Sequence, residues 1–396
     1  MSEITGSSKT PRSDSRLRGI FVVSVLLALL LLVTLYYVLD LLGIDGRRRH
    51  GFLAIVMASQ FAIIAALLMI FGRHRGVKLA TCTFGLGVVL TAIIALWPTI
   101  AEWRRAEEYN VPVSIGSMLI PHLNGGGPQI DKTVTYSTAL DGSSVVLDIW
   151  RAPGVPDGKL RPAIVKVHGG SWTGGSRSGQ QEWNKLFNDL GYDVFDVDYR
   201  MPPPVRWLDE IGDVKCAIGW MLANASKYQL DIQRISTMGP SAGGNLALLA
   251  AYSVGDPRLP PSCHATDVKI RSVINLYGPT DMALLYSTTD SRDGLPAAMD
   301  AYIGGSPSEL PDRYKILSPV SHINTQTPPT ITLQGETDRI VPVQQAMILA
   351  KALAAAGIDH ETYLFPWANH GFDVNWGSIA TQVARAKVVA FLQKHG

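Results

Sequence analysis

The sequence is short of cysteine and of charge. Its 396 residues include three cysteines, and 17% are Asp, Glu, Lys or Arg. No Cys-x-x-Cys pair occurs, so the sequence offers no redox or zinc-binding motif of that kind. The formal net charge of +2 gives no basic excess that would indicate a nucleic-acid partner. Composition therefore argues against a disulfide-rich scaffold and against a nucleic-acid-binding protein.

The positions of the cysteines limit the covalent chemistry further. Cys82 lies in an apolar run, which leaves Cys216 with Cys263 as the one conceivable disulfide. Cys216 falls on the predicted buried face of a helix, where cysteine usually packs as a small hydrophobe. We therefore expect these two thiols to be unbridged.

Apolar residues, in contrast, make up 47% of the chain and are concentrated near its start. A basic, Ser-rich tail over residues 1–18 is predicted to be disordered. Each of the three apolar runs that follow has about 20 residues, enough for a helix to cross a bilayer. The runs are Ile20–Leu39, Phe52–Phe71 and Leu79–Ile100. A cleavable signal peptide is the alternative for the first run, but no small-x-small site follows it before Asp40. Residues 19–103 are thus predicted to be a three-span membrane anchor.

The basic residues that flank these runs predict the orientation of the anchor. With the N-terminus inside, the cytoplasmic flanks carry seven Lys and Arg, against five on the other side. The positive-inside rule then favours a C-terminal domain outside the cytoplasm. No Asp, Glu, Lys or Arg interrupts the three runs. Since buried charges mark ion and proton paths, their absence favours a simple anchor.

A linker over residues 104–129, rich in Pro and Gly, precedes a soluble domain over residues 130–396. In this domain β-branched runs alternate with amphipathic helical patterns, among them a long helix predicted over Leu208–Tyr228, and Asp141-Gly142 marks a hairpin between the first two strands. The pattern predicts an α/β fold with a doubly wound, mainly parallel sheet of eight strands, the first pair antiparallel. Nearly fifty residues separate Asp281 from Pro329, far more than a βα connection needs. We interpret residues 282–328 as a cap inserted over the active site; a surface excursion without a catalytic role is the alternative.

The most informative stretch is Ile235–Asn245, where a β-branched run ends in Gly-Pro-Ser-Ala-Gly-Gly and a helical run follows. This is the G-x-S-x-G pattern in its strand–turn–helix context. Small residues at 239 and 243 allow a turn sharp enough to expose the hydroxyl of Ser241, and glycine tolerates the strained backbone best. The pattern predicts that Ser241 is a nucleophile.

A serine nucleophile needs a base, and the base needs an orienting acid; behind this kind of turn the chain order is Ser, acid, His. His370 follows the last predicted strand in Asn369-His370-Gly371 and is the predicted base. Asp338, a few residues past the predicted strand Thr330–Leu333, is the predicted acid. Glu336 is its rival in the same loop.

The tetrahedral oxyanion formed by serine attack needs N–H donors. His168-Gly169-Gly170 at the end of a predicted strand supplies two of them, because residues without side chains let the backbone approach the substrate oxygen. The predicted donors are the N–H groups of Gly169, Gly170 and Ala242. Three further segments have other expected roles. Asp198-Tyr199-Arg200 is expected to brace the glycine turn, Asp281 to cap a helix, and Trp172, Tyr286 and Trp367 to line a pocket or to pack in the core.

Five of these motifs together resemble the α/β-hydrolase fold, and within it the hormone-sensitive-lipase-like and feruloyl-esterase-like carboxylesterases. They are His168-Gly169-Gly170-Ser171-Trp172, Val197-Asp198-Tyr199-Arg200, Gly239-Pro240-Ser241-Ala242-Gly243-Gly244, Gly335-Glu336-Thr337-Asp338 and Asn369-His370-Gly371-Phe372. The resemblance covers roughly residues 130–396. Two departures are Ser171, where the third glycine of an H-G-G-G motif often stands, and Pro240, where an acidic residue often precedes the nucleophile.

The sequence therefore predicts a membrane-anchored serine carboxylesterase or lipase that works through an acyl-enzyme and acts on a small-molecule or lipid ester. It predicts no cofactor and no metal, and it leaves the oligomeric state open. The predicted location is the cell membrane, with the catalytic domain outside the cytoplasm. An arylformamidase, a serine peptidase of the same fold and a catalytically inert membrane scaffold are the alternatives.

Overall fold

The computed structural model describes residues 96–119, 130–138, 142, 144–154, 158–265, 269–289 and 294–396. Within these residues, eight strands form one sheet in the order β1-β2-β4-β3-β5-β6-β7-β8. From β4 to β8 all neighbouring strands are parallel, whereas β2 pairs antiparallel with both β1 and β4. The predicted sheet of eight mainly parallel strands is confirmed, with a second antiparallel pairing that the sequence did not indicate.

The strands are β1 Lys132–Thr138, β2 Ser144–Trp150, β3 Arg161–Val167, β4 Asp193–Val197, β5 Leu230–Pro240, β6 Ser272–Leu276, β7 Thr330–Gly335 and β8 His360–Phe365. The helices of the same domain are α5 Gln181–Asp189, α6 Trp207–Ala223, α7 Ala225–Tyr228, α8 Ala242–Tyr252, α12 Gln344–Ala355 and α13 Ile379–His395. The short helix α4 Ile115–Leu119 precedes β1.

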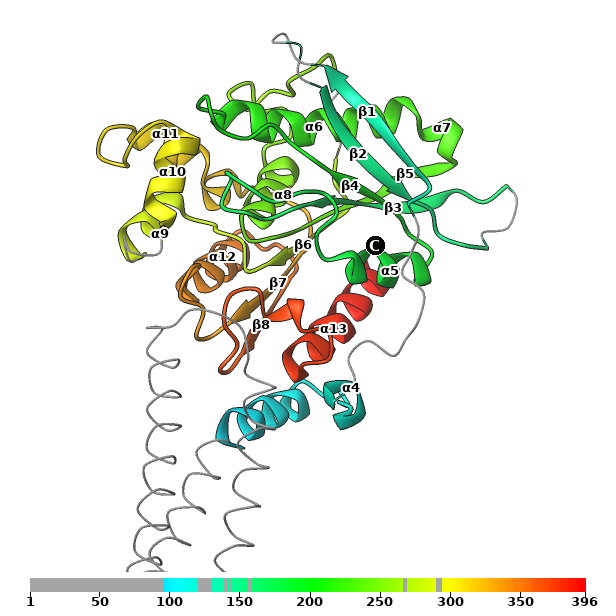
Figure 1. Cartoon of the computed structure of the whole chain (residues 1–396), viewed down its shortest axis with the longest axis vertical. Coiled ribbons are helices and arrows are strands. Elements are labelled where there is room, and N and C mark those ends of the chain that lie inside the picture. Colours follow the sequence, from blue (N-terminus) through cyan, green and yellow to red (C-terminus); the bar gives the residue numbers. More distant parts are fainter. Residues whose placement is uncertain are drawn as a thin grey trace, which may run out of the picture. The chain divides into compact units, whose positions relative to one another are not determined.

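The central strands are apolar on both faces because helices cover both faces. All residues of β4, β6 and β7 are buried, as expected for parallel strands between two helical layers. One hydrophobic core contains side chains of α6, α8 and α12, and the other contains side chains of α5 and α13. Figure 1 shows these two helix sets on opposite faces of the sheet. The site-bearing loops therefore extend from a rigid, doubly covered sheet.

The long insertion between β6 and β7 folds into helices α9 Met282–Thr288, α10 Leu295–Ile303 and α11 Pro311–Ile316 and the 3-10 turn η2 Pro319–His322 (Figure 1). As predicted, Asp281 caps α9, its side chain accepting a hydrogen bond from the N–H of Leu284 at 3.0 Å. The amide of Asn245 in α8 donates to the carbonyl of Leu317 at 3.1 Å. The insertion is thus attached to the helix that follows Ser241, and its role as a cap stays a prediction.

The compact unit that holds the sheet begins at Pro98. The predicted linker runs over residues 104–129, and its first residues belong to this unit. Ala106 is buried in the core on the α13 side of the sheet, and the N–H of Ser114 donates to the Gln382 side chain at 2.7 Å. The predicted domain boundaries stay predictions.

The predicted tail and the first two predicted spans lie outside the described residues, as does most of the third, Leu79–Ile100. Among the helices that the structure describes, none combines the length and the apolar character needed to cross a bilayer.

Two local predictions were wrong. The helix expected over Leu208–Tyr228 is broken at Asn224, whose side chain donates to the Trp220 carbonyl at 2.9 Å and ends α6. Cys216 and Cys263, expected to be free thiols, form a disulfide. The bridge forms because the loop after α8 returns across α6, where the N–H of Ser262 donates to the Gly212 carbonyl at 3.0 Å. A side chain at Gly212 would press on Ser262, so glycine permits the approach.

Candidate active site

The turn between β5 and α8 presents Ser241 as the sequence predicts. Ser241 has φ 55° and ψ −127°, a conformation that a side-chain-bearing residue adopts only under constraint. Its N–H donates to the Leu276 carbonyl at 2.9 Å, which ties the turn to β6. A Cβ at Gly239 would collide with the Gly243 carbonyl, and one at Gly243 with the Val167 carbonyl. Glycine is therefore required on both sides of the serine.

The three residues predicted as nucleophile, base and acid lie in one hydrogen-bonded chain. His370 Nε2 is 2.9 Å from Ser241 Oγ, and His370 Nδ1 is 2.8 Å from Asp338 Oδ2. The Asp338 carboxylate is buried, while 21% of the His370 side chain is exposed. A carboxylate at Nδ1 favours the tautomer with the proton on Nδ1, which leaves Nε2 free to accept the serine proton.

Four donors hold the Asp338 carboxylate. Oδ1 accepts the N–H groups of Ile340 at 2.9 Å and Val341 at 2.8 Å, and Oδ2 accepts the Gln334 amide at 3.0 Å in addition to His370. These contacts fix one oxygen toward the imidazole. Glu336, the rival acid, instead forms an ion pair with Arg105 at 2.9 Å.

The predicted oxyanion turn lies against the serine turn. A Cβ built on Gly169 would stand 2.8 Å from the Pro240 carbonyl oxygen and 3.3 Å from Ser241 Cβ. Within the described part of the chain, the N–H groups of Gly169 and Gly170 have no hydrogen-bond acceptor. Ala242 is the first residue of α8, where N–H groups point out of the helix. The geometry leaves these donors available for a substrate oxygen.

The residues predicted to brace the glycine turn do contact it. The Tyr199 hydroxyl donates to the His168 carbonyl at 3.0 Å, and the two rings stack with centroids 4.2 Å apart. Burial lowers the pKa of His168, so its imidazole is neutral near pH 7. Asp198 accepts the N–H of Arg177 at 2.7 Å, which closes the loop beneath the turn.

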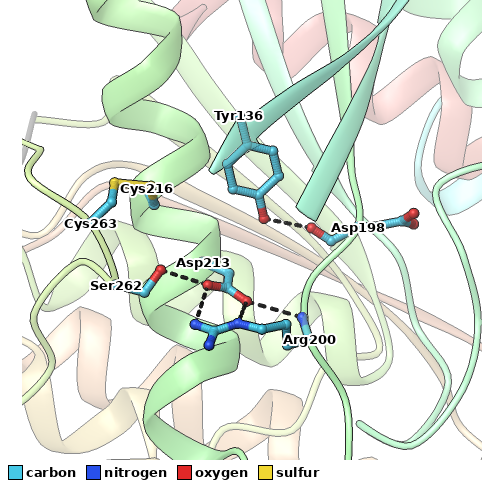
Figure 2. Close-up of a disulfide and its surroundings, with 7 residues drawn as sticks. All are labelled: Tyr136, Asp198, Arg200, Asp213, Cys216, Ser262 and Cys263. Carbon is cyan, nitrogen blue, oxygen red and sulfur yellow. Dashed lines mark hydrogen bonds and ion pairs between the residues drawn. A yellow bond between two sulfur atoms is a disulfide. The ribbon is translucent and has the colours of Figure 1, made fainter. Parts of the chain in front are cut away.

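A second layer of contacts ties this brace to α6 and to the disulfide, as Figure 2 shows. The Arg200 guanidinium donates to both oxygens of Asp213, at 2.9 and 2.7 Å. Ser262 Oγ donates to Asp213 Oδ1 at 2.5 Å. Ser262 is followed directly by Cys263, which is bridged to Cys216 on α6. The disulfide therefore holds the loop that carries Ser262, and Ser262 in turn contacts Asp213, the partner of Arg200.

Sequence reasoning missed a buried carboxylate close to the predicted base. Asp373 accepts hydrogen bonds from the Gln180 amide at 2.9 Å, from Trp183 Nε1 at 2.8 Å and from the Tyr277 hydroxyl. Burial raises its pKa. The Tyr277 ring in turn meets the His370 imidazole edge-on, with centroids 4.8 Å apart. The signal in the sequence was an aspartate three residues after His370, but its partners come from two distant segments, the start of α5 and the residue after β6.

The three aromatic residues for which packing and pocket-lining roles were left open have different environments. Trp172 is buried and stacks on Tyr302 of α10 at 5.2 Å. Tyr286 packs edge-on against Tyr314 at 5.8 Å. Trp367, three residues before His370, is 41% exposed. Trp172 and Tyr286 therefore pack within the fold, whereas Trp367 lies at the surface.

Comparison with known proteins places this arrangement in a family. Residues 147–353, more than half of the chain, match the family model BD-FAE. The chain belongs to the BD-FAE family. The matched region includes the glycine turn, Ser241 and Asp338, while His370 lies beyond its end.

Relatives of this BD-FAE chain include two proteins of Mycobacterium tuberculosis. It is 30% identical to esterase LipQ over 263 residues, which are 65% of this chain and 62% of LipQ. It is 32% identical to the probable carboxylic ester hydrolase LipM over 242 residues, which are 61% of this chain and 56% of LipM. The chain thus spans about three-fifths of the length of these relatives.

A solved structure supports the fold. Esterase Est2 of Thermogutta terrifontis with bound propionate matches with a TM-score of 0.57 and 26% identity, covering 68% of this chain and 96% of Est2. A truncated carbohydrate esterase from gut microbiota matches with a TM-score of 0.58 at 23% identity, covering 68% of this chain and 98% of that one, and supports the fold alone. The predicted α/β-hydrolase fold is confirmed; the finer choice between its lipase-like and feruloyl-esterase-like groups stays a prediction.

Proposed function

We propose that this protein is a serine carboxylesterase in which Ser241 is the nucleophile, His370 the general base and Asp338 the acid that orients it. The observation that carries the proposal is the continuous chain from Ser241 Oγ through both ring nitrogens of His370 to Asp338, at 2.9 and 2.8 Å. The family membership and the esterase names of its relatives support the reaction class.

In the proposed reaction, Ser241 Oγ attacks the ester carbonyl carbon while His370 Nε2 takes the hydroxyl proton. The resulting oxyanion accepts hydrogen bonds from the N–H groups of Gly169, Gly170 and Ala242. The tetrahedral intermediate then expels the alcohol, which receives the proton from His370 and leaves an acyl-serine. Water, deprotonated by the same imidazole, attacks the acyl-serine and releases the carboxylic acid and free Ser241.

Replacing Ser241 by alanine tests the nucleophile. We expect Ser241→Ala to lower kcat for short p-nitrophenyl esters by roughly 10⁵-fold or more, the scale measured for serine nucleophiles of unrelated proteases, and to abolish labelling by a fluorophosphonate. Ser287→Ala, on the exposed face of α9, is the matched control and should retain both. Undiminished turnover in the Ser241 variant would rule out the proposal.

The substrate class can be identified by comparing the hydrolysis of different substrates. Ester, formamide and peptide substrates compared on one preparation separate an esterase from an arylformamidase or a serine peptidase. Because kcat/KM compares transition-state stabilisation directly, the substrate with the highest value identifies the class. We expect the ester to give that value. Absence of both turnover and fluorophosphonate labelling in the unmodified protein would instead favour an inert scaffold.

We further propose that residues 19–103 anchor the enzyme in the cell membrane, with the catalytic domain outside the cytoplasm. Three uncharged runs of about 20 residues support the anchor. The excess of Lys and Arg on the predicted cytoplasmic flanks supports the side. The Cys216–Cys263 disulfide is an independent argument for the side, because such bridges persist in oxidising compartments and are rare in the cytosol. A lipid-derived ester is a reasonable substrate for an enzyme so placed.

A further inference from the structure

The segment just before the predicted catalytic domain contacts the loop that carries Asp338 and the strand β8, which leads to His370. Arg105 lies in the helix that ends at residue 108, more than 230 positions from the acid loop, residues 335–341. Its Nη1 donates to Glu336 Oε1 at 2.9 Å and to the carbonyl of Leu364 at 2.8 Å. Glu336 is two residues before Asp338, and Leu364 is in β8, which leads to His370. One guanidinium therefore joins the acid loop to the strand before the base.

Tyr109 makes the second contact to the same strand. Its hydroxyl donates to the Leu364 carbonyl at 3.1 Å and accepts the Leu364 N–H at 3.0 Å. Among the described strands β8 is the last of the sheet, so the edge of β8 that faces away from β7 has no neighbouring strand to pair with. The Tyr109 ring also packs edge-on against Tyr363 at 5.0 Å and Phe365 at 6.5 Å. The segment thus substitutes for a ninth strand at this one residue.

The acid loop is also hydrogen-bonded directly to the end of β8 and to the base loop, residues 366–371. The N–H of Glu336 donates to the Phe365 carbonyl at 2.9 Å, and Thr337 Oγ1 donates to the Ala368 carbonyl at 2.9 Å. Further along, the N–H of Arg339 donates to Asn369 Oδ1 at 3.2 Å. A shift of the acid loop against β8 would therefore change the distance between Asp338 and His370.

A chain of aromatic rings leads from the same segment to the base. Tyr109 meets Phe365, Phe365 packs on Phe372 with centroids 5.0 Å apart, and Phe372 meets Tyr277 at 5.6 Å. Tyr277 contacts the His370 imidazole at 4.8 Å. The polar contacts of Arg105 thus reach the loop that carries Asp338, and the aromatic chain from Tyr109 reaches His370.

We infer that Arg105 and Tyr109 are positioning residues: they clamp the acid loop to β8 and so hold Asp338 and His370 in register for catalysis. This inference rests on the proposed function of Ser241, His370 and Asp338. It adds residues outside the BD-FAE region, since that match begins at residue 147. The clamp follows directly after the predicted third span, so the orientation of the proposed catalytic pair depends on chain that adjoins the proposed anchor.

The clamp makes a prediction that separates positioning from folding. Arg105 and Glu336 are 26% and 34% exposed, and ion pairs so close to water contribute little to stability. Misplacement of catalytic groups, in contrast, is costly in rate. We expect Arg105→Ala in the full chain to lower kcat per active site about fivefold to tenfold with little change in KM. Tyr109→Phe, which removes the hydroxyl but keeps the ring, should lower kcat about threefold.

Two controls make the measurement decisive. Active sites are counted by the amount of fluorophosphonate label that the protein incorporates. A smaller amount of folded enzyme is then not mistaken for a lower rate per active site. Arg104→Ala removes a neighbouring exposed arginine of the same helix and should leave kcat unchanged. The charge-reversed pair Arg105→Glu with Glu336→Arg restores the ion pair but not the hydrogen bond to the Leu364 carbonyl, so it should recover only part of the rate that Arg105→Glu alone loses.

An unchanged kcat per titrated site in Arg105→Ala and Tyr109→Phe would overturn the inference, as would equal losses in Arg105→Ala and Arg104→Ala. A lower titratable fraction with a normal rate per site would also overturn it, because that is the signature of a purely structural role. None of these results touches the proposed nucleophile, whose failure would appear as turnover and labelling that survive in Ser241→Ala.

Discussion

At the scale of single residues, the proposed chemistry depends on how each side chain is prevented from moving. Ser241 is fixed by its backbone, at φ 55° between glycines that tolerate no Cβ. Asp338 is fixed by hydrogen bonds, because four donors converge on its two oxygens. His370 has polar partners on both ring nitrogens, and its imidazole meets the Tyr277 ring in an edge-type contact. The orientation of the imidazole therefore depends on its contacts with Ser241, Asp338 and Tyr277.

The orientation of the imidazole can be tested through Asp338. Asp338→Asn keeps the shape of the side chain, but its amide can donate to Nδ1 and so favour the tautomer with the proton on Nε2. That tautomer cannot accept the serine proton, and we expect kcat to fall by roughly 10³- to 10⁴-fold, as in other triads. The measurement is p-nitrophenyl ester turnover at pH 8. Asp359→Asn, an exposed carboxylate paired with Lys394, should have no effect, and a similar loss in both variants would contradict the assignment.

At the scale of elements, α6 connects the proposed oxyanion turn to the disulfide. Asp213 on α6 binds Arg200, the residue after Tyr199, whose hydroxyl holds the glycine turn. One turn further along α6, Cys216 is bridged to Cys263 across 47 positions of sequence. Since Ser262 also donates to Asp213, the disulfide stabilises the loop that completes this network (Figure 2).

Removing the disulfide should therefore lower the stability of the fold more than the rate of ester hydrolysis. For the double variant Cys216→Ala/Cys263→Ala we expect a loss of about 2–4 kcal/mol in the free energy of unfolding, the usual contribution of a bridge closing a loop of this length. The measurement is thermal denaturation of the oxidised protein, of the protein with reductant and of the double variant. The last two should melt together and below the first. Identical melting of all three would show that the bridge contributes nothing to stability.

At the scale of the whole molecule, the sheet topology brings the proposed site together. Parallel strands place their carboxyl ends at one edge, so the loops after β3, β5, β7 and β8 converge there although they are spread over more than 200 positions. The glycine turn, Ser241, Asp338 and His370 come from these four loops in that order. Arg105 and Tyr109 contact the loop after β7 and the strand β8 at the edge of the sheet.

The proposed placement of the whole molecule is tested by its topology in cells. A C-terminal alkaline phosphatase fusion of the full chain should be active in bacterial cells, and the corresponding fluorescent-protein fusion should be dark, because the first reporter folds outside the cytoplasm and the second inside. Alkaline carbonate should leave the chain in the membrane fraction. The opposite reporter pattern would reverse the proposed side, and release by carbonate would exclude the proposed anchor.

Most of the fold could be predicted from the sequence because its signals are local. Alternating β-branched and amphipathic runs predicted the eight strands, and the glycines around Ser241 predicted a turn that only small residues can form. The candidate serine and histidine could be predicted from their order in the chain and from the strands that they follow, whereas two carboxylates of one loop competed for the role of the acid. The break between helices α6 and α7 at Asn224 could not be predicted, because it depends on one side chain that competes for a backbone carbonyl.

The sequence by itself determined the eight strands, the order along the chain of the loops that follow them, and the residue types available for a serine hydrolase. Only the tertiary structure decided which carboxylate meets His370, since Asp338 and Glu336 differ by two positions and the loop turns one inward and the other toward Arg105. It also decided the pairing of Cys216 with Cys263, the place of Asp373 and the clamp at Arg105 and Tyr109. In each case the partners are far apart in the chain, and such contacts leave no periodic or local pattern from which they could be read.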